Sequence, residues 1–229
     1  MPNRLGYCGG DDQRAMLDYY QAGASDGGLR QIMSKFQAAV PYLKLIAQEN
    51  YIADPFDDRV VEAYWLGNEL LEQVDLAGFR RSLHERFAGR LSPVAAERLI
   101  GKAMLGARAH HSFHVLEVWS RTGESTPDVA MLDSCRIGWG TVRTMEPGSF
   151  LIEARPVLAI GERLALGEPA LRRIWRSIGG YDFLAEAKAG DSVSFHWDWA
   201  CEIISQAQAQ MLERYTRAHI ELLNQRPPW

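Results

Sequence analysis

The residues best suited to metal or proton chemistry lie in one short stretch, His110-His111-Ser-Phe-His114. If the stretch is helical, His110 and His114 share one face of the helix and can supply two imidazoles to one metal ion. The stretch lacks the glutamate of a His-Glu-x-x-His motif, which argues against a zinc protease. Two interpretations stay open: a metal or haem site formed by His110, His111 and His114, and a hydrogen-bonded packing patch.

Acidic residues and the remaining histidines add to this picture. A carboxylate ligand for the histidine stretch could come from Glu62 or Glu117. His84 and His219 lie among charged residues of amphipathic segments, so we expect both on solvated helix faces.

The chain has three cysteines, Cys8, Cys135 and Cys201, which are too few and too widely spaced for a disulfide framework or a zinc ribbon. We expect Cys201 in the core of a helix. Cys8 lies in a Tyr-Cys-Gly-Gly sequence that is typical of a flexible turn. Either Cys135 or Cys8 is a candidate ligand, Cys8 as a second carrier site.

The first 120 residues have the periodicity and cap signals of helices. Asp11 or Asp12 can cap the first helix, Gly23 can stop it, and Pro41 should divide the second segment. Asp54-Pro55 and Ser92-Pro93 each combine an N-cap residue with proline at the first helical position. The predicted helical segments cover residues 12–20, 29–47, 54–74, 92–105 and 109–119.

The pattern changes after a turn-rich stretch at 121–128, which we interpret as a linker. Short runs with strand character follow, separated by glycine turns, at 137–145, 149–160 and 193–197, and they favour a small barrel. Helical spacing returns from about Trp199. The predicted fold class is α+β: an all-helical N-terminal domain (1–127), then a small OB-like β-barrel with a long C-terminal helix (128–229).

Two segments of the C-terminal third combine a metal-ligating residue with a strand. The first is Cys135-Arg-Ile-Gly-Trp-Gly140-Thr-Val142, a cysteine followed by an aliphatic stretch, a glycine and a strand. The second is Gly190-Asp191-Ser-Val-Ser-Phe-His196, a closing strand with one histidine that leads into a terminal helix. In this order the two segments resemble the HypC/HupF family of hydrogenase assembly chaperones. The N-terminal helical part resembles only an uncharacterised bacterial family.

The resemblance implies an accessory chaperone for nickel-iron hydrogenase maturation rather than an enzyme. Cys135 would be the thiolate ligand and His196 the second group for an iron fragment that carries cyanide and carbon monoxide. The fragment would come from an iron-scaffold maturation protein and go to the hydrogenase large-subunit precursor. Such a site should be partly open to solvent. This chain differs from the family in that Cys135 is internal, Trp139 stands where proline is usual, and the stretch 157–189 is longer.

Composition limits the alternatives. The net charge is −4, and basic residues are interspersed with acids, which makes nucleic acid an unexpected partner. No run approaches the roughly 20 apolar residues of a membrane span, and the N-terminus lacks a secretory signal, so we expect a cytoplasmic protein. The rivals to the chaperone are a metalloenzyme that uses iron or haem at His110, His111 and His114, and a metal-free interaction protein.

Overall fold

The computed structural model describes residues 12–87, 89–119 and 128–225. Its first part is helical and ends in a π-helical segment, η1. The elements are α1 (Gln13–Ala22), α2 (Gly27–Ser34), α3 (Val40–Glu49), α4 (Asp58–Trp65), α5 (Leu70–Gln73), α6 (Leu76–Phe87), α7 (Pro93–Met104), α8 (His111–Phe113) and η1 (His114–Trp119).

The second part combines strands with two helices. It consists of α10 (Val129–Cys135), β1 (Gly138–Glu146), β2 (Ser149–Ala154), β3 (Val157–Ile160), β4 (Arg163–Leu166), β5 (Ala170–Trp175), β6 (Ser177–Ile178), β7 (Tyr181–Asp182), β8 (Ser192–His196), β9 (Trp199–Ile204) and α11 (Gln206–Asn224). The predicted fold class, α+β with helices first and a strand-rich part followed by a terminal helix, is confirmed.

Five strands form a barrel in the order β1-β2-β5-β9-β8. All of their pairings are antiparallel except β5 with β9, which closes the ring through one parallel pair, Trp175 with Trp199. Numbered among themselves, the strands follow the order 1-2-3-5-4, as in a five-stranded OB-type Greek key barrel. The β3–β4 and β6–β7 hairpins stand outside this ring.

Two glycines let β1 pack tightly in the barrel. A Cβ at Gly138 would lie 2.2 Å from the ring of its cross-strand partner Phe195, and one at Gly140 would lie 2.5 Å from the backbone oxygen of Glu153. Because Phe195 fills the barrel interior, glycine at position 138 is required by packing.

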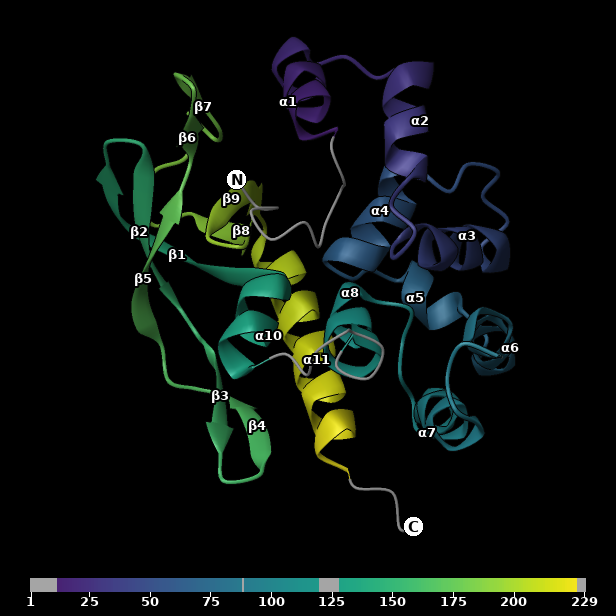
Figure 1. Cartoon of the computed structure of the whole chain (residues 1–229). Helices are drawn as coiled ribbons and strands as arrows, with labels where there is room; N and C mark the ends of the chain where they lie inside the picture. The colour runs from purple at the N-terminus through teal and green to yellow at the C-terminus, as the bar shows by residue number, and fades with distance from the viewer. Residues whose placement is uncertain (1–11, 88, 120–127, 226–229) are drawn as a thin grey trace.

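Helix α11 lies between the barrel and the N-terminal helices (Figure 1). Of the four apolar clusters among the described residues, three contain residues from both sides of position 127. In one of these, Tyr215 and Leu222 of α11 pack with α3, α4 and α6. The division into domains 1–127 and 128–229 stays a prediction, and the shared clusters show where the two parts pack on each other.

Local signals predicted several helix boundaries correctly. Gly23 ends α1 in the left-handed conformation, and Pro41 begins α3 at its first turn, so the predicted segment 29–47 is indeed divided. Ser92 caps α7 through its side chain, as expected for Ser-Pro. The linker prediction, 121–128, lies outside the described residues except for Asp128, which caps α10.

The single helix predicted over 54–74 is wrong. Helix α4 begins only after Asp57, whose side chain caps it, and the chain turns at Gly67, where φ is +95°. A Cβ at Gly67 would lie 2.5 Å from the ring of Tyr215 on α11. The close approach of α11 therefore interrupts the helix, and a separate short helix, α5, follows.

The predicted start of the terminal helix at Trp199 is also wrong. Residues Trp199–Ile204 form strand β9, and α11 starts at Gln206 behind a capping box of Ser205 and Gln208. Cys201 is therefore a half-buried strand residue and not part of a helix core. The run 149–160 is likewise two strands, because Pro156 separates β2 from β3.

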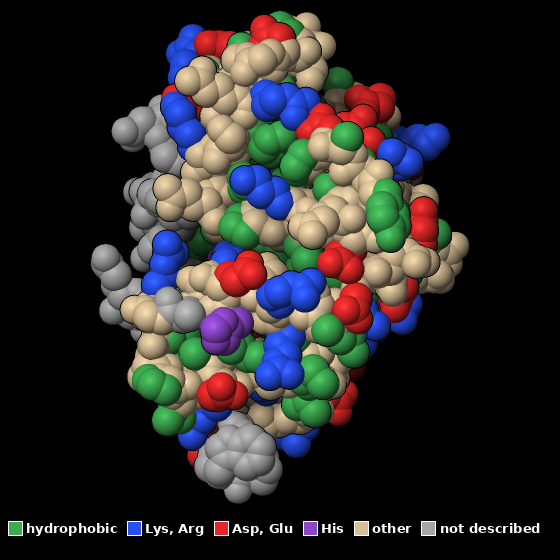
Figure 2. All heavy atoms as spheres, turned by 90° about the vertical axis from the view of Figure 1, so that its right-hand side faces the viewer, with side chains coloured by type: hydrophobic (Ala, Val, Ile, Leu, Met, Phe, Trp, Pro, Cys, Tyr) green, Lys and Arg blue, Asp and Glu red, His purple; other side chains and the backbone are tan. Residues whose placement is uncertain are grey.

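Among the described residues, no helix has the length and apolar character needed to cross a membrane. The face shown in Figure 2 carries interspersed Lys/Arg and Asp/Glu side chains, as the sequence indicates.

Candidate metal centre

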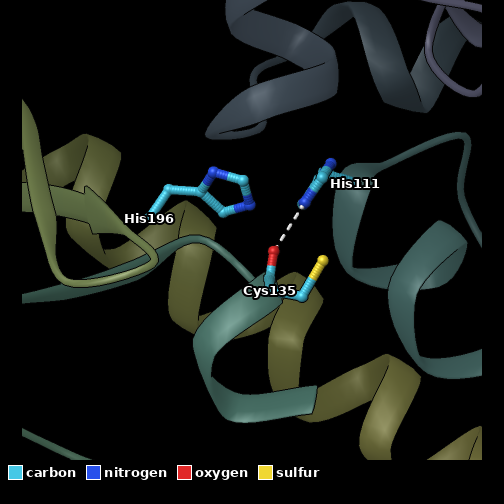
Figure 3. A group of neighbouring side chains, drawn as sticks. All are labelled: His111, Cys135 and His196. Atoms are coloured by element: carbon cyan, nitrogen blue, oxygen red, sulfur yellow. Dashed lines mark hydrogen bonds between the residues drawn. The ribbon is translucent and has the colours of Figure 1, made fainter. Parts of the chain in front are cut away.

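Three side chains from distant parts of the chain meet where the helical part packs on the barrel. One possible ligand atom from each of His111, Cys135 and His196 lies within 4.8 Å of the others, and all three residues are buried. Figure 3 shows the His196 ring pointing toward His111, with the Cys135 thiol beside His111; the two rings are nearly perpendicular, at 85°. The structure thus brings Cys135 and His196 together, as the sequence predicted, and adds one member of the histidine stretch.

Cys135 is the last residue of α10, and buried ion pairs fix this helix end to the barrel. Asp133 bonds to the Arg136 guanidinium at 2.8 Å and to that of Arg172 on β5 at 2.7 Å. It also accepts the backbone N–H of Val157 at 2.8 Å. Arg136 is only 1% exposed, so Asp133 supplies the countercharge that makes its burial tolerable.

His196 ends β8, immediately before the tight turn to β9. Trp197 and Asp198 both have positive φ, 50° and 63°, as a two-residue hairpin turn requires. Such a backbone is unusual for tryptophan. The backbone N–H of Trp197 donates to the carbonyl of Ser134 at 2.9 Å. This hydrogen bond connects the turn to the end of α10 and holds His196 beside Cys135.

His111 is the first residue of α8, and two hydrogen bonds define its tautomer. Nε2 lies 2.9 Å from the carbonyl oxygen of Cys135, and Nδ1 lies 3.2 Å from the hydroxyl of Tyr64. A carbonyl can only accept, so Nε2 carries the hydrogen and Nδ1 accepts the O–H of Tyr64. The Trp65 ring contacts both His111 and His196 and closes this side of the group.

Both imidazoles of the group are neutral near pH 7. Burial lowers the pKa of His111 to about 4, against a smaller opposite effect of the Cys135 backbone. Burial and the neighbouring His111 lower the pKa of His196 to about 3. Neutral imidazole is the form that binds metal ions, so proton competition is weak at this site.

The donor set suits a borderline or soft transition metal. One thiolate and two imidazoles are typical ligands of zinc, copper and iron, whereas magnesium and calcium prefer oxygen. Nε2 of His196 is buried and makes no well-formed hydrogen bond within the described residues, although the Cys135 backbone opposes the lowering of the His196 pKa. A buried imidazole nitrogen without a well-formed partner is available to a ligand. Atoms bound to one metal at ~2.0–2.3 Å in tetrahedral geometry would lie roughly 3.3–3.8 Å apart, so metal binding would draw the three ligand atoms closer by up to about 1.5 Å.

His110 and His114 lie elsewhere. His110 precedes α8 in an extended conformation, so it does not share a helix face with His114 as predicted. It accepts a hydrogen bond from Ser112, whose hydroxyl accepts from Nδ1 of His219, each at 2.7 Å. His114 packs against the ring of Tyr42. For His110, the structure therefore favours the packing interpretation.

Three further expectations need correction. His219 is completely buried, because α11 turns it toward α8, and it is not on a solvated face. Neither suggested carboxylate joins the group: Glu117 pairs with Lys102 at 3.5 Å, and Glu62 accepts from Gln208. The expected solvent opening is not found either, since Cys135 and His196 are only 7% and 8% exposed.

Tyr64 and Trp65 belong to this site but were not assigned to it from the sequence. Adjacent aromatic residues are typical of any packed or binding surface, and no spacing connects them with His111, which is 46 and 47 positions away. Only the packing of α4 against α8 identifies them as the surroundings of the histidine pair.

The fold and the site define a protein with a helical part, an OB-type barrel and a buried Cys-His-His group between them. The chain belongs to DUF6390, a family of unknown function, whose model matches residues 1–228. Comparison with curated proteins and with solved structures gave no match.

Proposed function

We propose that this protein binds one transition-metal centre through Cys135, His196 and His111, and that it is a non-catalytic accessory protein that carries the metal. The observation that carries the proposal is the convergence of a buried thiol and two neutral imidazoles from three separate elements. His196 supports it most directly, because its buried Nε2 has no well-formed hydrogen bond among the described residues.

We further propose that the cargo is iron for a nickel-iron hydrogenase. The similarity of the segments around Cys135 and His196 to the HypC/HupF chaperones supports this, as does the OB-type strand order. In this proposal Cys135 and His196 hold an iron fragment with cyanide and carbon monoxide ligands, in the cytoplasm. An iron-scaffold protein supplies the fragment, and the hydrogenase large-subunit precursor receives it. A thiolate suits such low-spin iron because it is a soft ligand.

A buried site requires that part of the protein move when cargo enters or leaves. The β8–β9 turn is the best candidate, because it carries His196 and contains the positive φ angles of Trp197 and Asp198. Among the described residues, the turn is attached by the Trp197–Ser134 hydrogen bond, by a 2.6 Å hydrogen bond from the backbone N–H of Trp175 to the Asp198 carbonyl, and by the Asp198–Arg172 ion pair of 2.7 Å. The Trp197 side chain also packs against an apolar cluster.

One observation favours a metal-free interaction protein as the second candidate. Both ring nitrogens of His111 already have protein hydrogen-bond partners, so His111 can equally be a member of a structural hydrogen-bond network. The metalloenzyme with three ligands from the histidine stretch has less support, because the ligand group found among the described residues contains His111 but neither His110 nor His114.

Metal content separates these candidates. The protein purified from iron-replete cells that express the hydrogenase maturation proteins should contain about one equivalent of iron and show the infrared bands of cyanide and carbon monoxide ligands. Cys135→Ala and His196→Ala should each abolish both signals and co-purification with the large-subunit precursor. Cys201→Ala is the matched control, because Cys201 is a half-buried cysteine on strand β9 of the barrel. This variant should keep the iron, the infrared bands and the co-purification.

The outcomes are distinct. Iron or zinc without diatomic ligands would support the metal site and contradict the hydrogenase cargo. A protein without metal, which also fails to bind added Fe²⁺ or Zn²⁺, would overturn the metal site and leave the metal-free interaction protein.

A further inference from the structure

The hydrogen bonds of His111 place a restriction on metal binding. Nε2 is the nitrogen next to Cys135, since it donates to that residue's carbonyl, while Nδ1 is directed at the Tyr64 hydroxyl. A metal held by the Cys135 thiolate would therefore take Nε2 of His111. In the structure that atom carries a hydrogen and has no lone pair to offer.

We propose that Tyr64 is a positioning residue that lets His111 exchange its tautomer when metal binds. Without metal, the Tyr64 O–H donates to Nδ1 and His111 donates from Nε2 to Cys135. With metal, Nε2 is the ligand, and Nδ1–H donates to the oxygen of Tyr64. The inference rests on the metal site proposed above.

A hydroxyl is suited to this exchange because it both donates and accepts, whereas a carbonyl or a carboxylate can only accept. The remaining contacts keep the imidazole in one place: the Tyr64 ring meets the His111 ring edge-on with centroids 5.5 Å apart, and the Trp65 ring lies 5.2 Å away. The ring therefore need not flip, and only its hydrogen changes position. A group that accepts a hydrogen bond from the non-ligating ring nitrogen commonly orients a ligand histidine and raises its basicity.

The protons balance. The hydrogen that leaves Nε2 is replaced by one at Nδ1 through exchange with solvent, so His111 stays neutral. The hydroxyl hydrogen of Tyr64 turns away from Nδ1, and no charge forms on that residue. The thiol of Cys135 loses one proton when it becomes a thiolate, so one proton is released for each metal ion bound.

Two measurements on the full-length protein test the inference, with Zn²⁺ as the probe. The first is the ¹⁵N NMR spectrum of the histidine-labelled protein, with the His111 signals assigned by comparison with His111→Gln. The hydrogen should be on Nε2 without zinc and on Nδ1 with zinc. The second is the zinc affinity of Tyr64→Phe, which should be roughly 10- to 100-fold weaker than that of the parent.

Tyr42→Phe is the matched control. Tyr42 is equally buried and stacks on Tyr64 with centroids 5.5 Å apart, but its hydroxyl interacts with Arg86 and not with His111. The Tyr42→Phe variant should bind zinc with the affinity of the parent protein. If Tyr64→Phe does not fold, the NMR measurement on the parent still decides.

A zinc-bound His111 that keeps its hydrogen on Nε2, or a Tyr64→Phe variant with unchanged zinc affinity, would overturn the role of Tyr64 and leave the metal site intact. Failure of the parent to bind zinc or iron at all would overturn the metal site and this inference with it.

Discussion

Stability toward acid offers a direct test of the buried histidines. Burial is the largest cause of the lowered pKa of five histidines: His110, His111, His114, His196 and His219. The pKa is about 4 for His111 and about 3 for His114, His196 and His219, whereas an unfolded histidine has a pKa of roughly 6.5.

The direction in which stability changes with pH follows from proton binding. Below about pH 6.5 the unfolded chain takes up protons that the folded chain refuses, so the free energy of unfolding falls as the pH falls. At about pH 5.5 the protonated form of an unfolded histidine outnumbers the neutral form about tenfold. Each such residue therefore lowers the free energy of unfolding by about 1.4 kcal/mol. Five residues together give roughly 7 kcal/mol, a large part of the about 5–15 kcal/mol by which domains are stable.

Urea unfolding of the metal-free protein between about pH 7.5 and pH 5.5 measures this loss. His219→Gln should reduce the loss by about 1.4 kcal/mol, since one titrating group is removed. A parent protein equally stable at both pH values would refute the assignment of these histidines as buried and neutral.

Three substitutions test the packing around the site, each by urea unfolding. Asp133→Ala leaves the buried Arg136 guanidinium without its countercharge and should cost about 3–5 kcal/mol of stability. The control Asp198→Ala removes a half-exposed side chain and should cost less than about 1 kcal/mol. Equal losses in the two variants would contradict the buried pairing. Lys102→Met removes the donor to the last carbonyls of α11 and a buried ion pair, and should also cost about 3–5 kcal/mol; a neutral result would mean that this lysine reaches solvent. Gly140→Ala forces a Cβ to within 2.5 Å of a backbone oxygen of β2 and should cost at least about 1–3 kcal/mol, so a fully stable variant would place β1 differently.

The sequence alone determined the class of fold and many local boundaries. The stops and starts at Gly23, Pro41 and Ser92 were predicted correctly because a cap or a proline acts through its own backbone and the next few residues. The change from helical to strand periodicity was equally local. Strand β9 was missed because six residues of mixed pattern beside a long amphipathic helix are assigned only by their pairing with β8.

The site was partly predictable. Cys135 and His196 were selected from the resemblance of their segments, and the structure places them together. Which member of the histidine stretch joins them is decided by the start of α8: His110 precedes the helix in extended backbone, so the chain turns between it and His111. The sequence does not encode that half-turn in any short pattern.

The remaining features depend on tertiary structure. The burial of His219, the break of the helix at Gly67 and the closeness of Tyr64 to His111 all result from the packing of α11 and α8 against the N-terminal helices. The sequence supplies the amphipathic faces that must be buried, but only the folded chain decides which face meets which. A hydrogen bond between positions 64 and 111 exists because those faces meet.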